Sequence, residues 1–508
     1  MDANQFREFG KAVIDYVADY TENIRDRSVL PSIEPGYLRP LLPSEAPLKP
    51  ESWQEILMDV ERVIMPGVTH WQSPNFHAYY PTASSYPSIV GDILSGAIGC
   101  VGFSWMAGPA CTELEVVMMD WLGKLLHLPE EFLNCSEGPG GGVIQGSASE
   151  ATFIALLAVK QRMVNEIQDA NPEISEDEIK SKLVAYSSDQ SNSSVEKAGI
   201  IGSVRMRLLE SNQDGQLEAK TLREAVKKDR EAGLIPCFVL ATLGTTGTCA
   251  FDDMQELGPV CVEENLWLHI DAAYAGSAFI CPEYRYLMKG VEYADSFNFN
   301  PHKWMLVNFD CSAMWVKDSR HLHNAFSVDR IYLKHNKVSS LPDYRHWQVP
   351  LGRRFRALKL WFVLRSYGVE GIQKHIRHQI ALAEHFKNLV ELDSRFEACT
   401  CSLGLVTFRL KGDDSLTQKL LDILTAKREL YAVPCRYRGK YVIRFAICAK
   451  STQVEDINWA WNMICKEADA LVGPKVRKVE IIDEIINEKA KFDAINITSN
   501  AESVEKSK

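Results

Sequence analysis

The sequence has few of the features that direct a chain to a membrane or to nucleic acid. No apolar run approaches the roughly 18 residues of a membrane-spanning helix, and the acidic, polar start Met1-Asp-Ala-Asn-Gln5 does not resemble a signal peptide. Acidic residues outnumber basic ones by 67 to 56, and the net charge of −11 argues against binding to a polyanion. We therefore expect a cytosolic protein that binds neither a membrane nor nucleic acid.

Cysteine pairs are missing as well. The 13 cysteines are scattered along the chain, and no two of them form a Cys-x-x-Cys pair. Zinc sites and disulfide frameworks use closely spaced cysteines, so we expect buried free thiols and no metal ion.

The glycine-rich segment Gly140-Gly-Gly-Val-Ile-Gln-Gly-Ser-Ala-Ser-Glu150 lacks the Gly-Lys-Ser/Thr of a nucleotide-binding Walker loop. A helical pattern follows it from residue 151 to about 164, and Ser147 and Glu150 have the spacing of a capping box. A helix that begins here presents free main-chain N–H groups at the positive end of its dipole, which suits a phosphate. Because such segments are more often plain turns, the prediction depends on the two motifs that come later.

The first of these is Asp295-Ser-Phe-Asn-Phe-Asn-Pro-His-Lys-Trp304, a strand-like run in which Lys303 follows a histidine. A lysine amine acts as a nucleophile when it forms a Schiff base with an aldehyde, and pyridoxal phosphate is the cofactor that most often uses it. On its own, Lys303 could equally be a surface lysine after a turn.

The second motif is Leu266-Trp-Leu-His-Ile270, a continuous apolar run that predicts a buried parallel strand with Asp271 at its carboxyl end. Open α/β sheets bind ligands at such strand ends. A carboxylate there can keep the pyridine nitrogen of pyridoxal phosphate protonated, so that the ring withdraws electrons from the substrate's α-carbon. The alternative role for Asp271 is the N-cap of a helix.

Together these motifs resemble the aromatic-L-amino-acid decarboxylases, the group II pyridoxal-phosphate decarboxylases of fold type I, over residues 1–472. The matching stretches are Phe76-His-Ala-Tyr-Tyr-Pro-Thr-Ala-Ser-Ser85, Gly102-Phe-Ser-Trp105, Gln145-Gly-Ser-Ala-Ser-Glu150, Val184-Ala-Tyr-Ser-Ser-Asp-Gln190, His269-Ile-Asp-Ala-Ala273 and Asn300-Pro-His-Lys303. The resemblance implies a Schiff base at Lys303 and Asp271 on the ring nitrogen. It places further residues around the cofactor: Ser147, Ala148, Ser149, Thr246, Ala273, Asn300 and His302.

The resemblance also implies a homodimer whose subunits share the substrate pocket. Trp71, Tyr79, Tyr80 and Thr82 would surround the ring and carboxylate of the substrate, although several of these aromatic residues could be ordinary core. Val101 and Phe103 would reach the pocket from the other subunit. The amphipathic pattern of residues 6–24 predicts a helix that packs on that partner.

The regular alternation of strands and helices fails between residues 326 and 344. We interpret the polar stretch 330–340 as a mobile lid whose Tyr332 acts on the substrate when the lid closes. A surface loop with an incidental tyrosine is the alternative.

Asn192, in Gln190-Ser-Asn-Ser-Ser194, departs from the family pattern, which usually has a histidine here. An amide hydrogen-bonds but has no pKa near neutrality. Asparagine at this place resembles the insect aromatic acetaldehyde synthases, which form 3,4-dihydroxyphenylacetaldehyde from L-dopa. The resemblance thus implies dioxygen as co-substrate, with carbon dioxide, ammonia and hydrogen peroxide as further products.

Two other functions stay open. One is an ordinary decarboxylase that releases dopamine or tyramine and tolerates Asn192, and the other is a catalytically silent binding protein. The presence of Lys303 and Asp271 argues against silence. Because Tyr79 and Tyr80 offer hydroxyl groups to a catechol, we expect L-dopa as the preferred aromatic amino acid.

Length and pattern also suggest how the chain is divided. With 508 residues, it can bury a large core and form two or three domains. We predict an α/β protein with a mainly parallel sheet in the large domain, and a hairpin turn at Arg438-Gly439 in a small α+β domain. The predicted parts are an N-terminal helical segment (1–87), the large cofactor-binding domain (88–367), the small domain (368–474) and a helical, then disordered tail (475–508).

Overall fold

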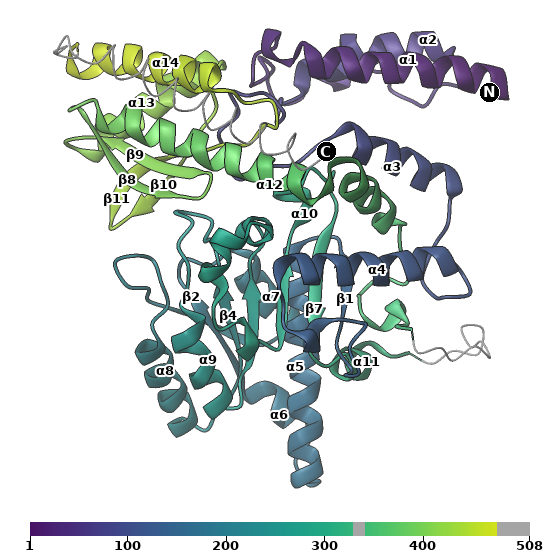
Figure 1. Cartoon of the computed structure of the whole chain (residues 1–508), viewed down its shortest axis with the longest axis vertical. Coiled ribbons are helices and arrows are strands. Elements are labelled where there is room, and N and C mark those ends of the chain that lie inside the picture. Colours follow the sequence, from purple (N-terminus) through teal and green to yellow (C-terminus); the bar gives the residue numbers. More distant parts are fainter. Residues whose placement is uncertain (329–340, 475–508) are drawn as a thin grey trace, which may run out of the picture.

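A computed structural model describes residues 1–328 and 341–474 (Figure 1). The predictions for Tyr332 and for residues 475–508 therefore lie outside the described residues. Figure 1 shows a large sheet with helices around it, a smaller sheet beside one end, and the N-terminal helices across the top. Among the described helices, none combines the length and apolarity needed to cross a membrane.

The large sheet has seven strands in the order β1-β7-β6-β5-β4-β2-β3. Only β7 runs antiparallel to its neighbours, so the predicted mainly parallel sheet is confirmed. The strands are β1 (Gly141–Gln145), β2 (Leu183–Ser188), β3 (Arg205–Leu209), β4 (Ile235–Thr242), β5 (Trp267–Asp271), β6 (Ser296–Phe299) and β7 (Ser312–Val316).

Both faces of β5 are buried, which explains the continuous apolar run before Asp271. Neighbouring residues of β5 enter different cores: Trp267 packs in one cluster, whereas Leu268 packs in the other. The helices around the sheet are α4 (Pro109–Leu126), α5 (Ala148–Ala170), α6 (Glu176–Lys182), α7 (Ser194–Gly202), α8 (Ala219–Glu231), α9 (Met254–Glu263), α10 (Pro301–Trp304) and α11 (Arg320–Phe326).

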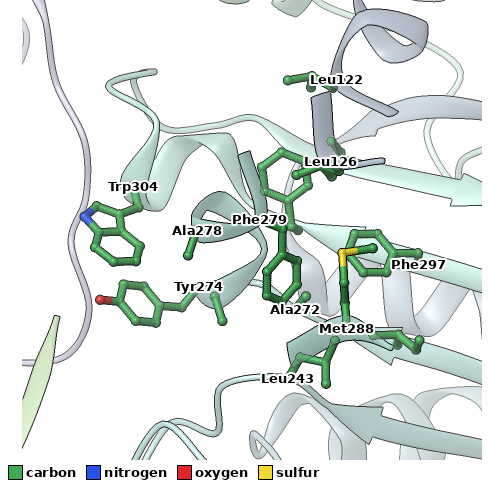
Figure 2. Packing of buried hydrophobic residues seen from close by; sticks show 14 of the residues in the cluster. Leu122, Leu126, Leu243, Ala272, Tyr274, Ala278, Phe279, Met288, Phe297 and Trp304 are labelled. Atoms are coloured by element: carbon green, nitrogen blue, oxygen red, sulfur yellow. The ribbon is translucent and has the colours of Figure 1, made fainter. Parts of the chain in front are cut away.

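The segment after Asp271 is fixed by one of these cores. Figure 2 shows Phe279 of this segment gathered with Leu126 of α4 and Phe297 of β6. The rings of Tyr274 and Trp304 stack with their centroids 4.6 Å apart. Such close packing of Tyr274 and Trp304 restricts the movement of their chain neighbours, Ala273 and Lys303.

The small sheet has four antiparallel strands in the order β10-β11-β9-β8. The predicted hairpin at Arg438-Gly439 is confirmed, since both residues have positive φ and join β10 to β11. Apolar residues of the strands and of three helices form its core. These elements are α12 (Arg356–Glu391), β8 (Phe396–Ser402), β9 (Leu405–Leu410), α13 (Asp414–Lys427), β10 (Val433–Tyr437), β11 (Lys440–Ala446) and α14 (Val454–Val472).

The N-terminal helix predicted for residues 6–24 is α1 (Ala3–Glu22), capped by Asp2. None of its residues is buried. Phe9 stacks on Trp53 with ring centroids 5.4 Å apart, and the hydroxyl of Tyr16 donates to the Glu61 carboxylate (2.6 Å). Trp53 begins α2 (Trp53–Asp59), which lies beside α1 in Figure 1. The first helix of the main body is α3 (Tyr86–Ile98).

Candidate active site

The glycine-rich segment connects β1 to the start of α5. Ser147 is the N-cap of α5, as predicted, and its Oγ accepts a hydrogen bond from the N–H of Glu150 (3.2 Å). The Glu150 carboxylate accepts one from the N–H of Gly146 (3.0 Å). A Cβ on Gly146 would lie 2.9 Å from that carboxylate, so a larger residue here would displace the Glu150 side chain. The first N–H groups of a helix have no partner within it, so the start of α5 suits an anion.

Asp271 ends β5 between Thr242 of β4 and Asn298 of β6. Its Oδ1 accepts a hydrogen bond from the N–H of Ala273 (2.9 Å), and the next helical turn begins only at Ala275, so the N-cap alternative is wrong. Burial raises the pKa of the Asp271 carboxyl, whereas the charge of Lys303 and the Ala273 N–H act in the opposite direction. A cationic partner would therefore stabilise the carboxylate.

Lys303 lies in the short helix α10, directly after β6. Burial lowers the pKa of its amine, Asp271 opposes this shift, and the nearby positive charge of Arg444 adds to it. A lowered pKa increases the fraction of neutral amine, the form that acts as a nucleophile. The Lys303 Nζ lies 5.5 Å from the ring centroid of Tyr80.

His302, the neighbour of Lys303, is held as a neutral ring. Its Nδ1 accepts a hydrogen bond from the N–H of Cys311 (2.8 Å), and burial lowers its pKa to about 3. The ring of Phe309 lies against it, with centroids 4.7 Å apart. His302 is therefore a shape and hydrogen-bonding element at neutral pH, not a ready acid.

Two adjoining cavities collect the predicted site residues. The smaller has a volume of about 200 Å³. It is lined by every residue that the sequence analysis placed around the cofactor: Ser147, Ala148, Ser149, Thr246, Asp271, Ala273, Asn300, His302 and Lys303. The larger, of about 530 Å³, is lined by four predicted substrate residues: Trp71, Tyr79, Tyr80 and Thr82. Lys303 and Asn192 line both cavities.

The smaller cavity fits pyridoxal phosphate. The N-terminus of α5 would hold the phosphate, Asp271 the ring nitrogen, and Lys303 the aldehyde carbon. A further sign of a polar ligand is Thr242 Oγ1, a buried hydroxyl of this cavity that has no hydrogen-bond partner among the described residues.

Asn192 follows β2 and lies where the two cavities meet. Its Nδ2 donates a hydrogen bond to Thr246 Oγ1 (3.2 Å), and its Oδ1 accepts one from the N–H of Ser194 (3.0 Å). Hydrogen bonds to both its nitrogen and its oxygen thus fix the orientation of the Asn192 amide. It has no titratable proton to give.

The aromatic wall of the larger cavity corrects one expectation. The hydroxyl of Tyr80 donates to the Thr245 carbonyl (2.8 Å), so Tyr80 offers its ring, but no free hydroxyl, to a catechol. The hydroxyl of Tyr79 pairs with that of Tyr431 (3.0 Å), and its ring stacks on Trp71. Of the two tyrosines, Tyr79 is 45% exposed, whereas Tyr80 is buried.

Val101 and Phe103 line neither cavity of their own chain. They lie in the loop between α3 and α4, where the N–H of Gly102 donates to the Arg353 carbonyl (3.1 Å). Val101 is 52% exposed. Their predicted action in a second subunit stays a prediction.

The sequence analysis missed the wall that the small domain contributes. This wall consists of Val433, Pro434, Cys435 and Arg444. The one signal was an arginine inside the apolar run Tyr441-Val-Ile-Arg-Phe-Ala-Ile447, because a charged side chain in a buried strand needs polar partners.

Comparisons with known proteins agree with this arrangement. The model of the pyridoxal-dependent decarboxylase conserved domain matches residues 35–411. Mouse aromatic-L-amino-acid decarboxylase is 57% identical over 475 residues, which cover 93% of this chain and 99% of the relative.

Two solved structures share the fold over nearly the whole chain. One is Oryza sativa TDC with PLP and tryptamine, with a TM-score of 0.88, 34% identity, and coverage of 92% of this chain and 99% of that one. The other is Rhodiola rosea 4-hydroxyphenylacetaldehyde synthase, with a TM-score of 0.86, 36% identity, and coverage of 93% and 99%. The likeness confirms the predicted fold type I.

Proposed function

Because the chain belongs to the aromatic-L-amino-acid decarboxylase family of pyridoxal-dependent decarboxylases, we propose that it decarboxylates L-dopa and releases the product as 3,4-dihydroxyphenylacetaldehyde. Pyridoxal phosphate as cofactor, decarboxylation of an aromatic L-amino acid and the class of carbon–carbon lyase follow from the family. The preference for L-dopa and the aldehyde product are the proposal.

Pyridoxal phosphate, when bound, supplies the aldehyde for a Schiff base and a ring that withdraws electrons from the α-carbon. Lys303 provides the attacking amine, and Asp271 would hold a proton at the ring nitrogen. The walls of the larger cavity, Trp71 and Tyr79 among them, would orient the aromatic ring of the substrate and exclude water. The groups that would act on the cofactor thus line the smaller cavity, and those that would bind the substrate ring line the larger one.

The fate of the α-carbon after loss of carbon dioxide depends on proton supply. Asn192 has no proton to transfer, His302 is neutral, and Tyr80 already donates its proton to a carbonyl. Among the described residues that line both cavities, Lys303 remains as the acid that would yield an amine. We propose that dioxygen reacts faster than Lys303 protonates the carbon.

The proposed reaction balances. L-Dopa, dioxygen and water give the aldehyde, carbon dioxide, ammonia and hydrogen peroxide. Two electrons pass from the α-carbon to dioxygen, which takes up two protons, and water then hydrolyses the carbon–nitrogen bond. A small energy difference decides between protonation of the α-carbon and its reaction with dioxygen, since a change of about 1.4 kcal/mol in one barrier changes the product ratio roughly tenfold.

The second candidate is ordinary amine release. The names of the similar relatives favour it, because relatives with 56–58% identity are called decarboxylases. The name of the Rhodiola rosea protein indicates that the same fold also supports aldehyde synthesis. The one observation that carries our proposal is the amide of Asn192 at the junction of the two cavities.

Product analysis decides between the candidates. The holoenzyme is given L-dopa in air and under nitrogen, and the organic products are separated and identified. The proposal predicts the aldehyde in air and its loss under nitrogen. Dopamine as the only product in air would leave the ordinary decarboxylase.

We also propose a cytosolic homodimer. Exposed apolar side chains gather on α3 and on the loop after it, which is unusual for a surface that faces only water. They are Tyr86, Val90, Ile93, Leu94, Ile98, Val101 and Met106. A partner on this face would carry Val101 and Phe103 toward the second active site.

A further inference from the structure

Arg444 brings a positive charge from the small sheet into the wall of the larger cavity. It lies on β11 and is only 3% exposed. Its Nε donates to the Gly247 carbonyl and its Nη2 to the Tyr79 carbonyl, both at 2.9 Å. The guanidinium carbon lies 5.1 Å from the ring centroid of Tyr80. These partners are two carbonyl groups and a ring rather than a carboxylate, so the side chain links chain segments instead of neutralising an acid.

The Gly247 carbonyl belongs to the segment that orients Asn192. Thr246 directly precedes Gly247, and its Oγ1 accepts the hydrogen bond from Asn192. A Cβ at Gly247 would meet nothing within 4 Å, so this point of the chain borders open space. The Gly247 carbonyl accepts hydrogen bonds from two side chains of the small domain, Arg444 and the Cys435 thiol (3.5 Å).

The Tyr79 carbonyl lies in a segment that is held under strain. Tyr79 has a φ of 56°, in the left-handed region that non-glycine residues rarely adopt. The hydrogen bond from Arg444 opposes relaxation of this backbone. One side chain therefore fixes both the aromatic wall of the larger cavity and the segment of Thr246.

We propose that Arg444 is a positioning residue that acts through Thr246 on the amide of Asn192, so that the small domain helps to set the ratio of aldehyde to amine. The inference rests on the proposed function. It requires a planar side chain with two donors at a fixed angle, which arginine has and lysine does not.

The test compares Arg444→Lys with Arg436→Lys. Arg436 lies on β10 of the same sheet, lines neither cavity, and donates to the Gly439 carbonyl on the exposed hairpin. Arg444→Lys keeps the charge but loses the paired geometry, so Thr246 and Asn192 can shift and admit water as a proton donor. We expect the ratio of amine to aldehyde to rise at least about threefold in Arg444→Lys and to stay unchanged in Arg436→Lys.

A double-mutant cycle separates positioning from general damage. If Arg444 acts through Asn192, then Arg444→Lys changes the product ratio much less when Asn192→His is already present. Equal changes in both backgrounds would show that Arg444 acts on the ratio by another route, and no change in either would overturn the inference outright.

Hydrogen exchange gives a readout that does not depend on the product. Amides of residues 76–82 and 244–250 should exchange faster in Arg444→Lys, while those of α8, remote from the contact, should not. If the wild type makes only amine, the proposed function fails, and this exchange still decides whether Arg444 holds the two segments. Should Arg444→Lys not fold, Thr246→Val removes the hydroxyl that holds Asn192, and an unchanged ratio in that variant contradicts the inference.

Discussion

At the scale of single residues, burial shifts the pKa values of Lys303 and Asp271 in opposite directions. It lowers the pKa of the amine and raises that of the carboxyl, so both groups shift toward their neutral forms. Each group opposes the other's shift through its charge. In the proposed site, the neutral amine would react with the aldehyde of the cofactor, and a cationic ring nitrogen would stabilise the Asp271 carboxylate.

The nearby charge of Arg444 gives this pair a testable pH dependence. Neutral Lys303 attacks the cofactor aldehyde, so the rate at which the apo-protein takes up pyridoxal phosphate should rise with pH toward the lowered pKa of the amine. Arg444 is one cause of that lowering. Arg444→Gln should therefore move the midpoint of the pH profile upward, measured by the growth of visible absorbance, while Arg436→Gln should not. A midpoint that moves downward would contradict this electrostatic role.

Residue motifs predicted most of the candidate site, but not its small-domain wall. Lys303 and Asp271 stand in recognisable local patterns, and the structure brings both to one cavity. Arg444 is separated from them by more than a hundred residues, and only the packing of two domains makes them neighbours. The engaged hydroxyl of Tyr80 was equally hidden, because its partner, the Thr245 carbonyl, lies far away in sequence.

At the scale of elements, the start of α5 is the proposed phosphate site. The side chain of Ser147 caps this helix and lines the smaller cavity. Ser147→Ala should lower stability by about 1 kcal/mol, the usual value of such a cap, and weaken the binding of pyridoxal phosphate as well. Thermal unfolding of the apo-protein and titration with the cofactor measure the two effects.

Ser175→Ala is the matched control for this prediction. Ser175 caps α6 in the same way, through the N–H of Glu178 (3.2 Å), and lines neither cavity. It should cost similar stability and leave cofactor affinity unchanged. Equal affinities in both variants would remove Ser147 from the phosphate site.

The fully buried strands were more predictable than the half-buried ones. The run before Asp271 is apolar on both faces, so its strand is evident from composition. By contrast, β8 has intermediate exposure over most of its length, and residues of intermediate and high exposure alternate along β10. Their pairing depends on partners elsewhere in the chain, which local propensity does not reveal.

At the scale of the whole molecule, the apolar face of α3 makes dimerisation testable. Ile98 is 57% exposed on this face. A charge buried in an apolar interface is costly, so Ile98→Asp should weaken the dimer and lower activity on dilution. The control is Ile200→Asp on α7, where the side chain is 79% exposed on another helix. Sedimentation measures both. A fully active wild-type monomer would disprove the shared site.

The division into an N-terminal segment, a large domain and a small domain stays a prediction about folding units. Most of the small sheet packs in a core of its own, whereas Leu405 of β9 and Ala446 of β11 pack in a core of the large sheet. Helix α12 contributes to both cores and is interrupted by a non-helical turn at Gly368. The larger cavity lies between them, since its walls come from both. Opening and closing of this boundary would change water access to the substrate.

In the proposed reaction, the amide of Asn192 leaves the α-carbon to react with dioxygen. Its most direct test is the amount of oxygen consumed for each carbon dioxide released from L-dopa, measured together in a closed cell. We predict a ratio near one for the wild type and a clearly lower ratio, with more dopamine, for Asn192→His. A wild-type ratio near zero, with no effect of Asn192→His, would contradict the account.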